Sequence, residues 1–285
     1  MKKWALITGA SRGLGEVLSK RFWDEGWSLI LLARNTASLE VVRNGLSKAP
    51  DQDCEIFSCD LSKPLQVDEV ISKITSSFAS VDVLINNAAI HGPIGPILST
   101  PLAGWRDVMQ VNFFAPVAFC QAFGLRMQTS NKGGAIINLS GGGATSSRPN
   151  FGAYASAKTA LVRFSETLAQ ELSSDGVRVN CISPGAMQTE LLKDVINAGD
   201  SLSGAKEYAS ASRVFLNGGA SMEAVSDLAL FLSGKSSANI SGKLISSVWD
   251  DWSNWPAHES ELSSSDIYTL RRIVARDRGF NWGDK

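Results

Sequence analysis

Histidine is scarce in this sequence: His91 and His258 are the two such residues among 285. They leave little material for a histidine-based zinc site or a Ser-His-Asp triad, so we expect no metal. Four cysteines without a paired metal-binding spacing indicate reduced thiols in a cytoplasmic enzyme. An excess of one charge is also missing, because 27 Lys and Arg face 28 Asp and Glu. This balance favours neither nucleic acid nor a strongly charged protein as partner.

Long hydrophobic runs are not found either. Runs such as residues 29–33 are far shorter than the roughly 20 residues of a membrane span, so we expect no membrane partner. A strand pattern that begins at Lys3 leaves no room for a signal peptide. A content of 44% hydrophobic and 19% charged residues is typical of a folded globular protein.

Short aliphatic runs alternate with longer stretches of helical periodicity along the chain. The runs lack polar alternation, so we expect strands buried on both faces of a parallel sheet. We predict strands near residues 4–7, 29–32, 55–58, 81–85, 135–139, 178–182 and 243–248, and helices near 14–23, 38–47, 67–78, 104–129 and 153–173. The predicted fold class is therefore α/β, a single doubly wound domain over residues 1–248 with helices on both faces of the sheet.

A glycine-rich loop, Thr8-Gly9-Ala10-Ser11-Arg12-Gly13-Leu14-Gly15, joins the first strand to the first helix. Its glycines permit a tight turn and bring backbone N–H groups close to a pyrophosphate, which the helix N-terminus also attracts. The spacing is G-x-x-x-G-x-G rather than G-x-G-x-x-G, so the loop alone is also compatible with a plain glycine-rich turn. The candidate phosphate-binding residues are Gly9, Ser11, Arg12, Gly13, Leu14 and Gly15.

Further motifs resemble those of the classical short-chain dehydrogenase/reductase family, in the family's order. After the T-G-x-x-x-G-x-G loop come Asp60-Leu61, Asn86-Asn87-Ala88-Ala89, Val111-Asn112, Tyr154-x-x-x-Lys158, and Pro184-Gly185 with Thr189; the family has glycine in place of Ala89. The resemblance implies a Rossmann domain that binds a nicotinamide dinucleotide, in a homodimer or homotetramer built through the long helices and the last strand. It places Asp60 and Leu61 at the adenine, Pro184, Gly185 and Thr189 over the nicotinamide, and Asn87 and Ala88 on the cofactor.

Tyr154 and Lys158 are four residues apart, so one helix face presents both side chains. A nearby ammonium would lower the tyrosine pKa from its usual value near 10 and make it a general acid and base. The pair by itself is also compatible with a solvent-exposed helix face. The resemblance implies that Lys158 also binds the nicotinamide ribose, and that Asn112 holds a water linked to Lys158.

The sequence departs from the family at the strand before the tyrosine. Members usually read I-x-N-x-S-S there, and the second serine, thirteen residues before the tyrosine, hydrogen-bonds the substrate carbonyl. Here Ser140 is followed by three glycines, and Gly141 takes that position. Either a backbone shift at the glycines brings Ser140 inward, which we favour, or no side chain of this strand supplies the bond. Possible substitutes on the loop are Thr145, Ser146 and Ser147.

The end of the second strand indicates which dinucleotide is preferred. NAD enzymes usually have an acidic residue there, whereas this chain reads Leu32-Ala33-Arg34-Asn35. Arg34 would bind a 2′-phosphate, and Arg12 lies on the same side in the family. Either arginine could instead be a plain surface residue, but together they favour NADP(H) over NAD(H).

The residues beyond Thr189 should cover the substrate. Residues 189–217 correspond to the family's mobile lid, and we expect His91 to be a solvent-facing loop residue near the mouth. A Trp-rich extension, residues 249–285, should be ordered and pack on the domain or a neighbouring subunit, where it would narrow the substrate mouth or merely cap the fold. Within it, residues 265–274 resemble a short helix with one apolar face, formed by Ile267, Leu270, Ile273 and Val274.

The expected function is NADP(H)-dependent hydride transfer between nicotinamide and a carbonyl or secondary alcohol, with Tyr154 as general acid and base. A second hypothesis is a catalytically silent dinucleotide-binding sensor, for which Gly141 is the best argument. An epimerase or dehydratase of nucleotide sugars is a third, although that branch of the family is longer and spaces its glycines differently. The sequence does not identify the substrate.

Overall fold

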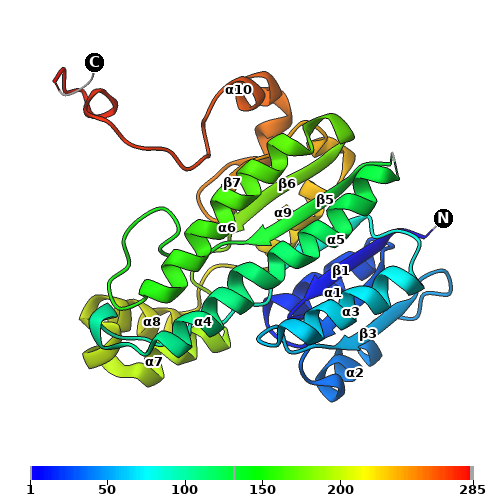
Figure 1. The fold of residues 1–285 in the computed structure, drawn as a ribbon, viewed down its shortest axis with the longest axis horizontal. Coiled ribbons are helices and arrows are strands. Elements are labelled where there is room, and N and C mark those ends of the chain that lie inside the picture. Colours follow the sequence, from blue (N-terminus) through cyan, green and yellow to red (C-terminus); the bar gives the residue numbers. More distant parts are fainter. Residues whose placement is uncertain (1, 131, 283–285) are drawn as a thin grey trace.

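The computed structural model describes residues 2–130 and 132–282. Within them, seven strands form one parallel sheet in the order β3-β2-β1-β4-β5-β6-β7 (Figure 1). The strands are β1 (Trp4–Thr8), β2 (Ser28–Ala33), β3 (Cys54–Ser58), β4 (Val83–Asn86), β5 (Gly134–Leu139), β6 (Val177–Ser183) and β7 (Leu244–Ser246). The strand order reverses between β1 and β4, and this is where doubly wound sheets open a crevice at their carboxyl ends. The predicted α/β fold is confirmed.

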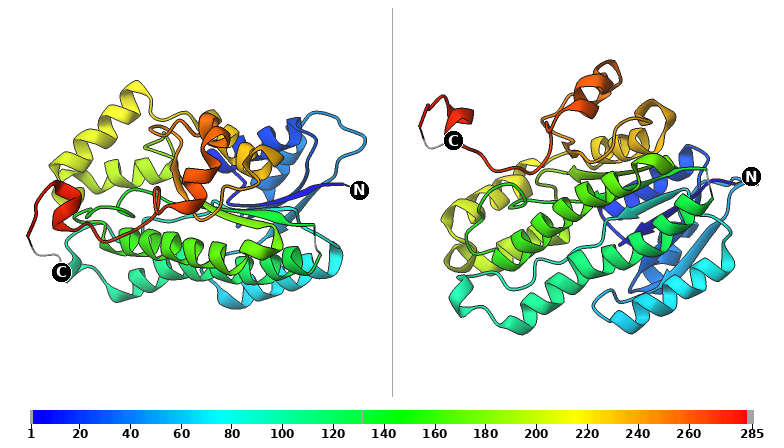
Figure 2. Two further views of the ribbon diagram at one scale, coloured as in Figure 1. Left: turned by 90° about the horizontal axis from the view of Figure 1, so that it is seen from above. Right: turned by 45° about the horizontal axis from the view of Figure 1, so that its top comes forward.

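Two layers of helices cover the sheet, one on each face (Figure 2). On one face lie α1 (Leu14–Asp24), α2 (Thr36–Asn44) and α9 (Met222–Ser233). On the other lie α3 (Pro64–Ser77), α5 (Ala115–Thr129) and α6 (Gly152–Glu171). All six residues of β2 are buried, as its unbroken apolar run predicts, whereas the edge strand β3 has no fully buried residue and differs from the expectation of burial on both faces.

The predicted long helix is one continuous helical run with a π-helical turn inside it. It consists of α4 (Leu102–Met109), the π turn Gln110–Phe114 and α5. By length and composition alone this run could cross a membrane, and half of its most apolar window is buried inside the fold. The expectation of no membrane partner rested on uninterrupted apolar runs and left out this longer, interrupted one. In this structure Phe119, Phe123 and Met127 pack against the sheet.

Two helices, α7 (Glu190–Ser203) and α8 (Ala205–Asn217), form the segment expected to be the lid (Figure 1). The backbone breaks helical geometry at Gly199, where φ is 71°. The helices close over the end of α6 through a small apolar cluster that includes Leu192, Val195, Ala211 and Phe151. Hydrophobic contacts of this kind stabilise α7 and α8 against the start of α6.

The first part of the C-terminal extension packs on the domain. Trp255 and Leu262 are 5% and 2% exposed and belong to the same hydrophobic core cluster as the buried residues of α1 and α9. Trp255 lies in the 3-10 segment Trp252–His258, and Leu262 in α10 (Glu259–Ser264). The Trp255 ring also contacts Tyr268, with centroids 4.4 Å apart.

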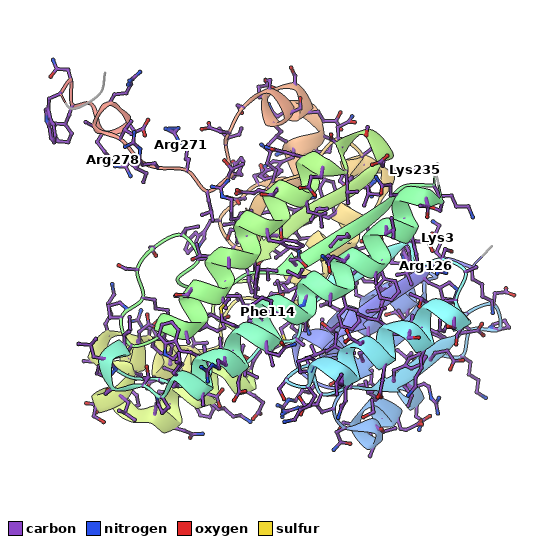
Figure 3. The ribbon with its side chains drawn as sticks, in the orientation of Figure 1. Lys3, Phe114, Arg126, Lys235, Arg271 and Arg278 are labelled. Carbon is purple, nitrogen blue, oxygen red and sulfur yellow. The ribbon has the colours of Figure 1, made fainter. Side chains whose placement is uncertain are left out.

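The helix predicted for residues 265–274 is wrong. Lys243 Nζ donates hydrogen bonds to the Ser265 and Ile267 carbonyls, and Leu244 N–H donates to Tyr268 O. The segment therefore satisfies its backbone groups along the exposed edge of β7, which is incompatible with a helical ladder. After Leu270 the chain leaves the domain, as the positions of Arg271 and Arg278 show (Figure 3). Residues 283–285 of the extension lie outside the described residues.

Candidate active site

Tyr154 lies in the first turns of α6, where its side chain is 6% exposed. Its hydroxyl fills the space next to Gly141, just past the carboxyl end of β5. A Cβ added at residue 141 would lie 2.3 Å from Tyr154 Oη and 3.0 Å from its Cζ, closer than real contacts allow. The glycine and the tyrosine are thus complementary, and a side chain at position 141 would displace the phenol.

Burial changes the acidity of the pair on α6. It raises the pKa of Tyr154 to about 12, and Arg148 is the charged neighbour that opposes this rise. Lys158 is 1% exposed, donates a 2.7 Å hydrogen bond to Leu139 O, and has its own pKa lowered to about 8 by burial. The expected depression of the tyrosine pKa by Lys158 is therefore not found, because desolvation of the phenol outweighs charge effects here.

Ser140 is buried beside the same glycines. Its N–H donates to Ile182 O, and within the described residues its Oγ has no hydrogen-bond partner. With Gly141, it borders a cavity of about 230 Å³ whose other walls include Trp249 and Asp250. The start of the C-terminal extension therefore lies next to the carboxyl end of β5.

His91 is not the solvent-facing residue expected from the sequence. It is 6% exposed, and its ring packs edge-on against Tyr154 with centroids 4.8 Å apart. Burial, followed by the charges of Arg148 and Lys158, lowers its pKa to about 3, so the imidazole is neutral at ordinary pH. Its Nδ1 lies 3.8 Å from Asp194 Oδ2 on α7. Because the loop folds inward under the lid, proximity in sequence to Asn87 could not predict this burial.

Asn112 lies in the π turn and is fully buried. Its Oδ1 accepts a hydrogen bond from Ile90 N–H, and its Nδ2 donates to Ile90 O. This two-sided contact fixes the loop that carries His91. Local π turns often occur at functional positions, and this one directs an amide at the active-site loop.

The glycine loop turns between β1 and α1 as the sequence predicts. Gly9 and Gly13 have positive φ values of 66° and 54°, and a Cβ at Gly9 would collide with Ala88 at 2.9 Å. Asn87 Nδ2 donates to the Thr8 and Gly9 carbonyls, which ties the end of β4 to the loop. Two motifs far apart in sequence therefore meet at the reversal of strand order.

Comparison with known proteins decides the family. The family model described as short chain dehydrogenase matches residues 3–199. The chain belongs to this family.

Among its relatives, the 3-oxoacyl-(acyl-carrier-protein) reductase FabG of Chlamydia trachomatis is 28% identical over 246 residues, covering 86% of this chain and 96% of the relative. An NAD+-bound xylitol dehydrogenase superimposes with a TM-score of 0.73, and YwfH, an NADPH dependent reductase of bacilysin biosynthesis, with 0.76. Both structures are 24% identical to this chain, covering 86% of it and 96% of their own chains. Since these two neighbours carry different cofactors in their names, they show the fold and leave the choice of cofactor to this chain's own residues.

The two arginines of this short-chain dehydrogenase face different neighbours. Arg34 is exposed at the end of β2, and its positive charge stabilises the carboxylate of Asp60. The charge of Arg12 instead stabilises the carboxylates of Glu190 and Asp194 on α7. Asn35 caps α2 by accepting a hydrogen bond from Ser38 N–H. No carboxylate follows Ala33 at this end of the strand, as the sequence indicated.

Sequence reasoning missed Arg148, on the loop between β5 and α6. Its guanidinium stacks over Phe151, with Cζ 3.8 Å from the ring centroid, and lies 5.9 Å from the Tyr154 centroid. It pairs with Glu207 of α8. No motif marks this residue, and only its position after the glycine run could have drawn attention to it. Among the residues that the structure describes, no cluster of His, Cys, Asp and Glu suits a metal ion.

Proposed function

We propose that this short-chain dehydrogenase is an NADP(H)-dependent oxidoreductase acting on a carbonyl or secondary alcohol, with Tyr154 as proton donor and acceptor. The observation that carries the proposal is the Tyr154 hydroxyl next to Gly141 at the carboxyl ends of the strands, with Lys158 buried one helical turn away. The nicotinamide supplies or accepts the hydride when bound.

The glycine loop suits a dinucleotide. Helix α1 begins at Leu14 without a side-chain cap, so its first N–H groups are available to an anion. A Cβ at Gly13 would meet only the Thr189 methyl group, at 3.8 Å, so the backbone here is open to a ligand. We assign the following residues to the dinucleotide: Gly9, Ser11, Arg12, Gly13, Leu14, Gly15, Arg34, Asp60, Leu61, Asn87, Ala88, Tyr154, Lys158, Pro184, Gly185 and Thr189.

Tyr154 is suited to giving a proton. With its pKa raised to about 12 by burial, the phenol is protonated near neutral pH, which is the form that a carbonyl reduction needs. Lys158 fixes the carboxyl end of β5 through Leu139 O and places its ammonium near the tyrosine ring, 5.7 Å from the centroid. Asn112 positions the neighbouring loop, and Ser140 is the candidate hydrogen-bond donor to the substrate oxygen.

The cofactor preference is tested by fluorescence titration of the wild type with NADPH and NADH. NADPH should bind at least about ten-fold tighter, since a charge-assisted pair contributes roughly 1.5–3 kcal/mol. Arg34→Asp should erase or reverse this preference. The control Arg213→Asp changes an exposed arginine on α8 and should leave the preference unchanged. Equal affinities in the wild type would contradict the assignment.

Turnover is tested with Tyr154→Phe, which should abolish carbonyl reduction and retain dinucleotide affinity, because only the hydroxyl is lost. Lys158→Ala should impair both. The alternative of a silent sensor, which Gly141 favours, predicts instead a wild type that binds dinucleotide and shows no change in nicotinamide absorbance with ketones, sugars or alcohols.

The assembly and location complete the proposal: a cytoplasmic homodimer or homotetramer that binds neither nucleic acid nor membrane. The exposed side chains of Phe114 (labelled in Figure 3) and of Leu125 on the long helical run offer apolar surface for such contacts. The edge of β7 is less accessible, because Tyr268 O already accepts from Leu244 N–H. Size-exclusion chromatography with light scattering tests the oligomeric state.

A further inference from the structure

Arg148 borders the reaction site from the side of the glycine run. Its side chain is 16% exposed, and its Nη1 would lie 3.6 Å from a Cβ built at Gly142. Gly142 follows Gly141, which contacts the Tyr154 hydroxyl. A guanidinium is therefore held near the place where a substrate carbonyl must meet the phenol.

The partner of Arg148 comes from the lid. Nε and Nη2 donate hydrogen bonds of 3.1 and 2.8 Å to the same oxygen, Oε2 of Glu207 on α8. A carboxylate that used both oxygens would match the planar guanidinium better, because the fork-to-fork arrangement forms two parallel bonds. Glu207 itself is one-third exposed. Another anion can therefore replace it on Arg148 without leaving the Glu207 carboxylate buried and unpaired.

Lid closure does not by itself require this ion pair. The apolar cluster of Leu192, Val195 and Ala211 against Phe151 already holds the lid on α6. A positive charge enclosed beside a phenol and a neutral imidazole is costly unless an anion accompanies it. Glu207 supplies that anion in this structure, through a single oxygen and from a one-third exposed position, so an anionic ligand can take its place on Arg148.

We propose that Arg148 is the anion anchor of the substrate site, and that the substrate is an oxo acid whose carboxylate replaces Glu207 on the guanidinium. Its carbonyl oxygen then faces Tyr154. The Arg148 Cζ lies 5.9 Å from the tyrosine ring centroid. Tyr154 Oη and Arg148 Nη1 lie beside the adjacent residues Gly141 and Gly142, so hydrogen bonds of about 2.8 Å at each end fit a carboxylate only a few bonds from the carbonyl, as in 2-oxo and 3-oxo acids. This inference rests on the proposed oxidoreductase function.

The test compares 3-oxobutanoate and 2-oxobutanoate with their methyl esters, which keep the shape and lose the charge. The measured quantity is the acid-to-ester ratio of kcat/KM. Arg148→Gln should lower this ratio about ten- to a hundred-fold, as expected for one charge-assisted contact. Arg148→Lys should recover part of it, because the charge remains and the fork is lost. The matched control Arg213→Gln removes an exposed positive charge from α8 and should leave the ratio as in the wild type.

Glu207→Gln distinguishes an anchor from a lid latch. If Arg148 binds substrate, removing the competing carboxylate raises the acid-to-ester ratio, opposite to the effect of Arg148→Gln. If the pair only latches the lid, both variants lower kcat/KM for acid and ester alike and the ratio stays constant, which overturns the inference.

Calorimetry of oxo-acid binding to Tyr154→Phe, with and without Arg148→Gln, adds a readout that needs no turnover. Binding that depends on Arg148 without any wild-type reduction would support the anchor and contradict the oxidoreductase proposal. Wild-type reduction of esters and acids at equal efficiency would support the oxidoreductase and overturn the anchor. Neither binding nor turnover of the acids would overturn both.

Discussion

Introducing a side chain at Gly141 should destabilise this protein, although the family usually carries a serine at the matching position. A Cβ at residue 141 would lie 2.3, 3.0 and 3.1 Å from Tyr154 Oη, Cζ and Cε1. The phenol cannot easily move aside, because His91 packs against its ring and Arg148 lies nearby. Overpacking of this kind costs about 1–3 kcal/mol. At roughly 2–4 °C per kcal/mol, Gly141→Ala should lower the Tm by several degrees.

If Tyr154 transfers the proton, as proposed, the same change should reduce kcat about a hundred-fold, since a displacement of the order of 1 Å at a reacting group has an effect of that size. Denaturant unfolding and steady-state kinetics measure the two losses. Gly142→Ala is the matched stability control, because the Cβ would meet its nearest atoms at 3.6 Å or more. It should change the free energy of unfolding by less than about 0.5 kcal/mol.

A double-mutant cycle identifies the phenol oxygen as the cause. In the Tyr154→Phe background the 2.3 Å contact no longer exists, so Gly141→Ala should destabilise by about 1 kcal/mol less than in the wild type. Wild-type stability and kcat in Gly141→Ala would refute the reasoning. An equal loss of stability in both backgrounds would place the conflict elsewhere than at the hydroxyl.

Three further tests address other parts of the molecule. Ser140→Ala should lower kcat about a hundred-fold if its unpartnered hydroxyl reaches the substrate oxygen, and a rate within a few-fold of wild type would assign that role elsewhere. Deleting residues 249–285 should destabilise the fold by removing the buried Trp255 and Leu262, whereas deleting 271–285 should preserve the Tm; equal effects of both deletions in calorimetry would contradict the packing. His91 has a folded-state pKa lowered to about 3 by burial, so its neutral form contributes stability that is fully present above the unfolded pKa near 6.5 and lost as pH falls toward 3. His91→Gln should therefore reduce the pH dependence of the free energy of unfolding between pH 6.5 and 4. An unchanged pH dependence would contradict the burial of His91.

The local sequence was enough to predict the architecture and much of the candidate site. Unbroken aliphatic runs predicted strands buried on both faces, and the glycine loop was predicted at the turn from β1 to α1. The i, i+4 relation of Tyr154 and Lys158 follows from helix geometry alone, so the structure places both on α6. Patterns of this kind are retained in the folded protein because they depend on residues that are close together in sequence.

Only the tertiary structure decided which groups surround the phenol. The Tyr154 hydroxyl lies against Gly141, while His91 arrives from the loop after β4 and Arg148 pairs with a lid glutamate. Residues 265–270 illustrate the same limit. Their sequence has helical periodicity, but their backbone carbonyls accept hydrogen bonds from Lys243 Nζ and from the N–H of Leu244 in β7 instead. Periodicity reports what a segment can do in isolation, whereas pKa values, burial and hydrogen-bond partners depend on segments distant in sequence. The family and fold therefore follow from the sequence, and the chemistry around Tyr154 from the way the chain encloses it.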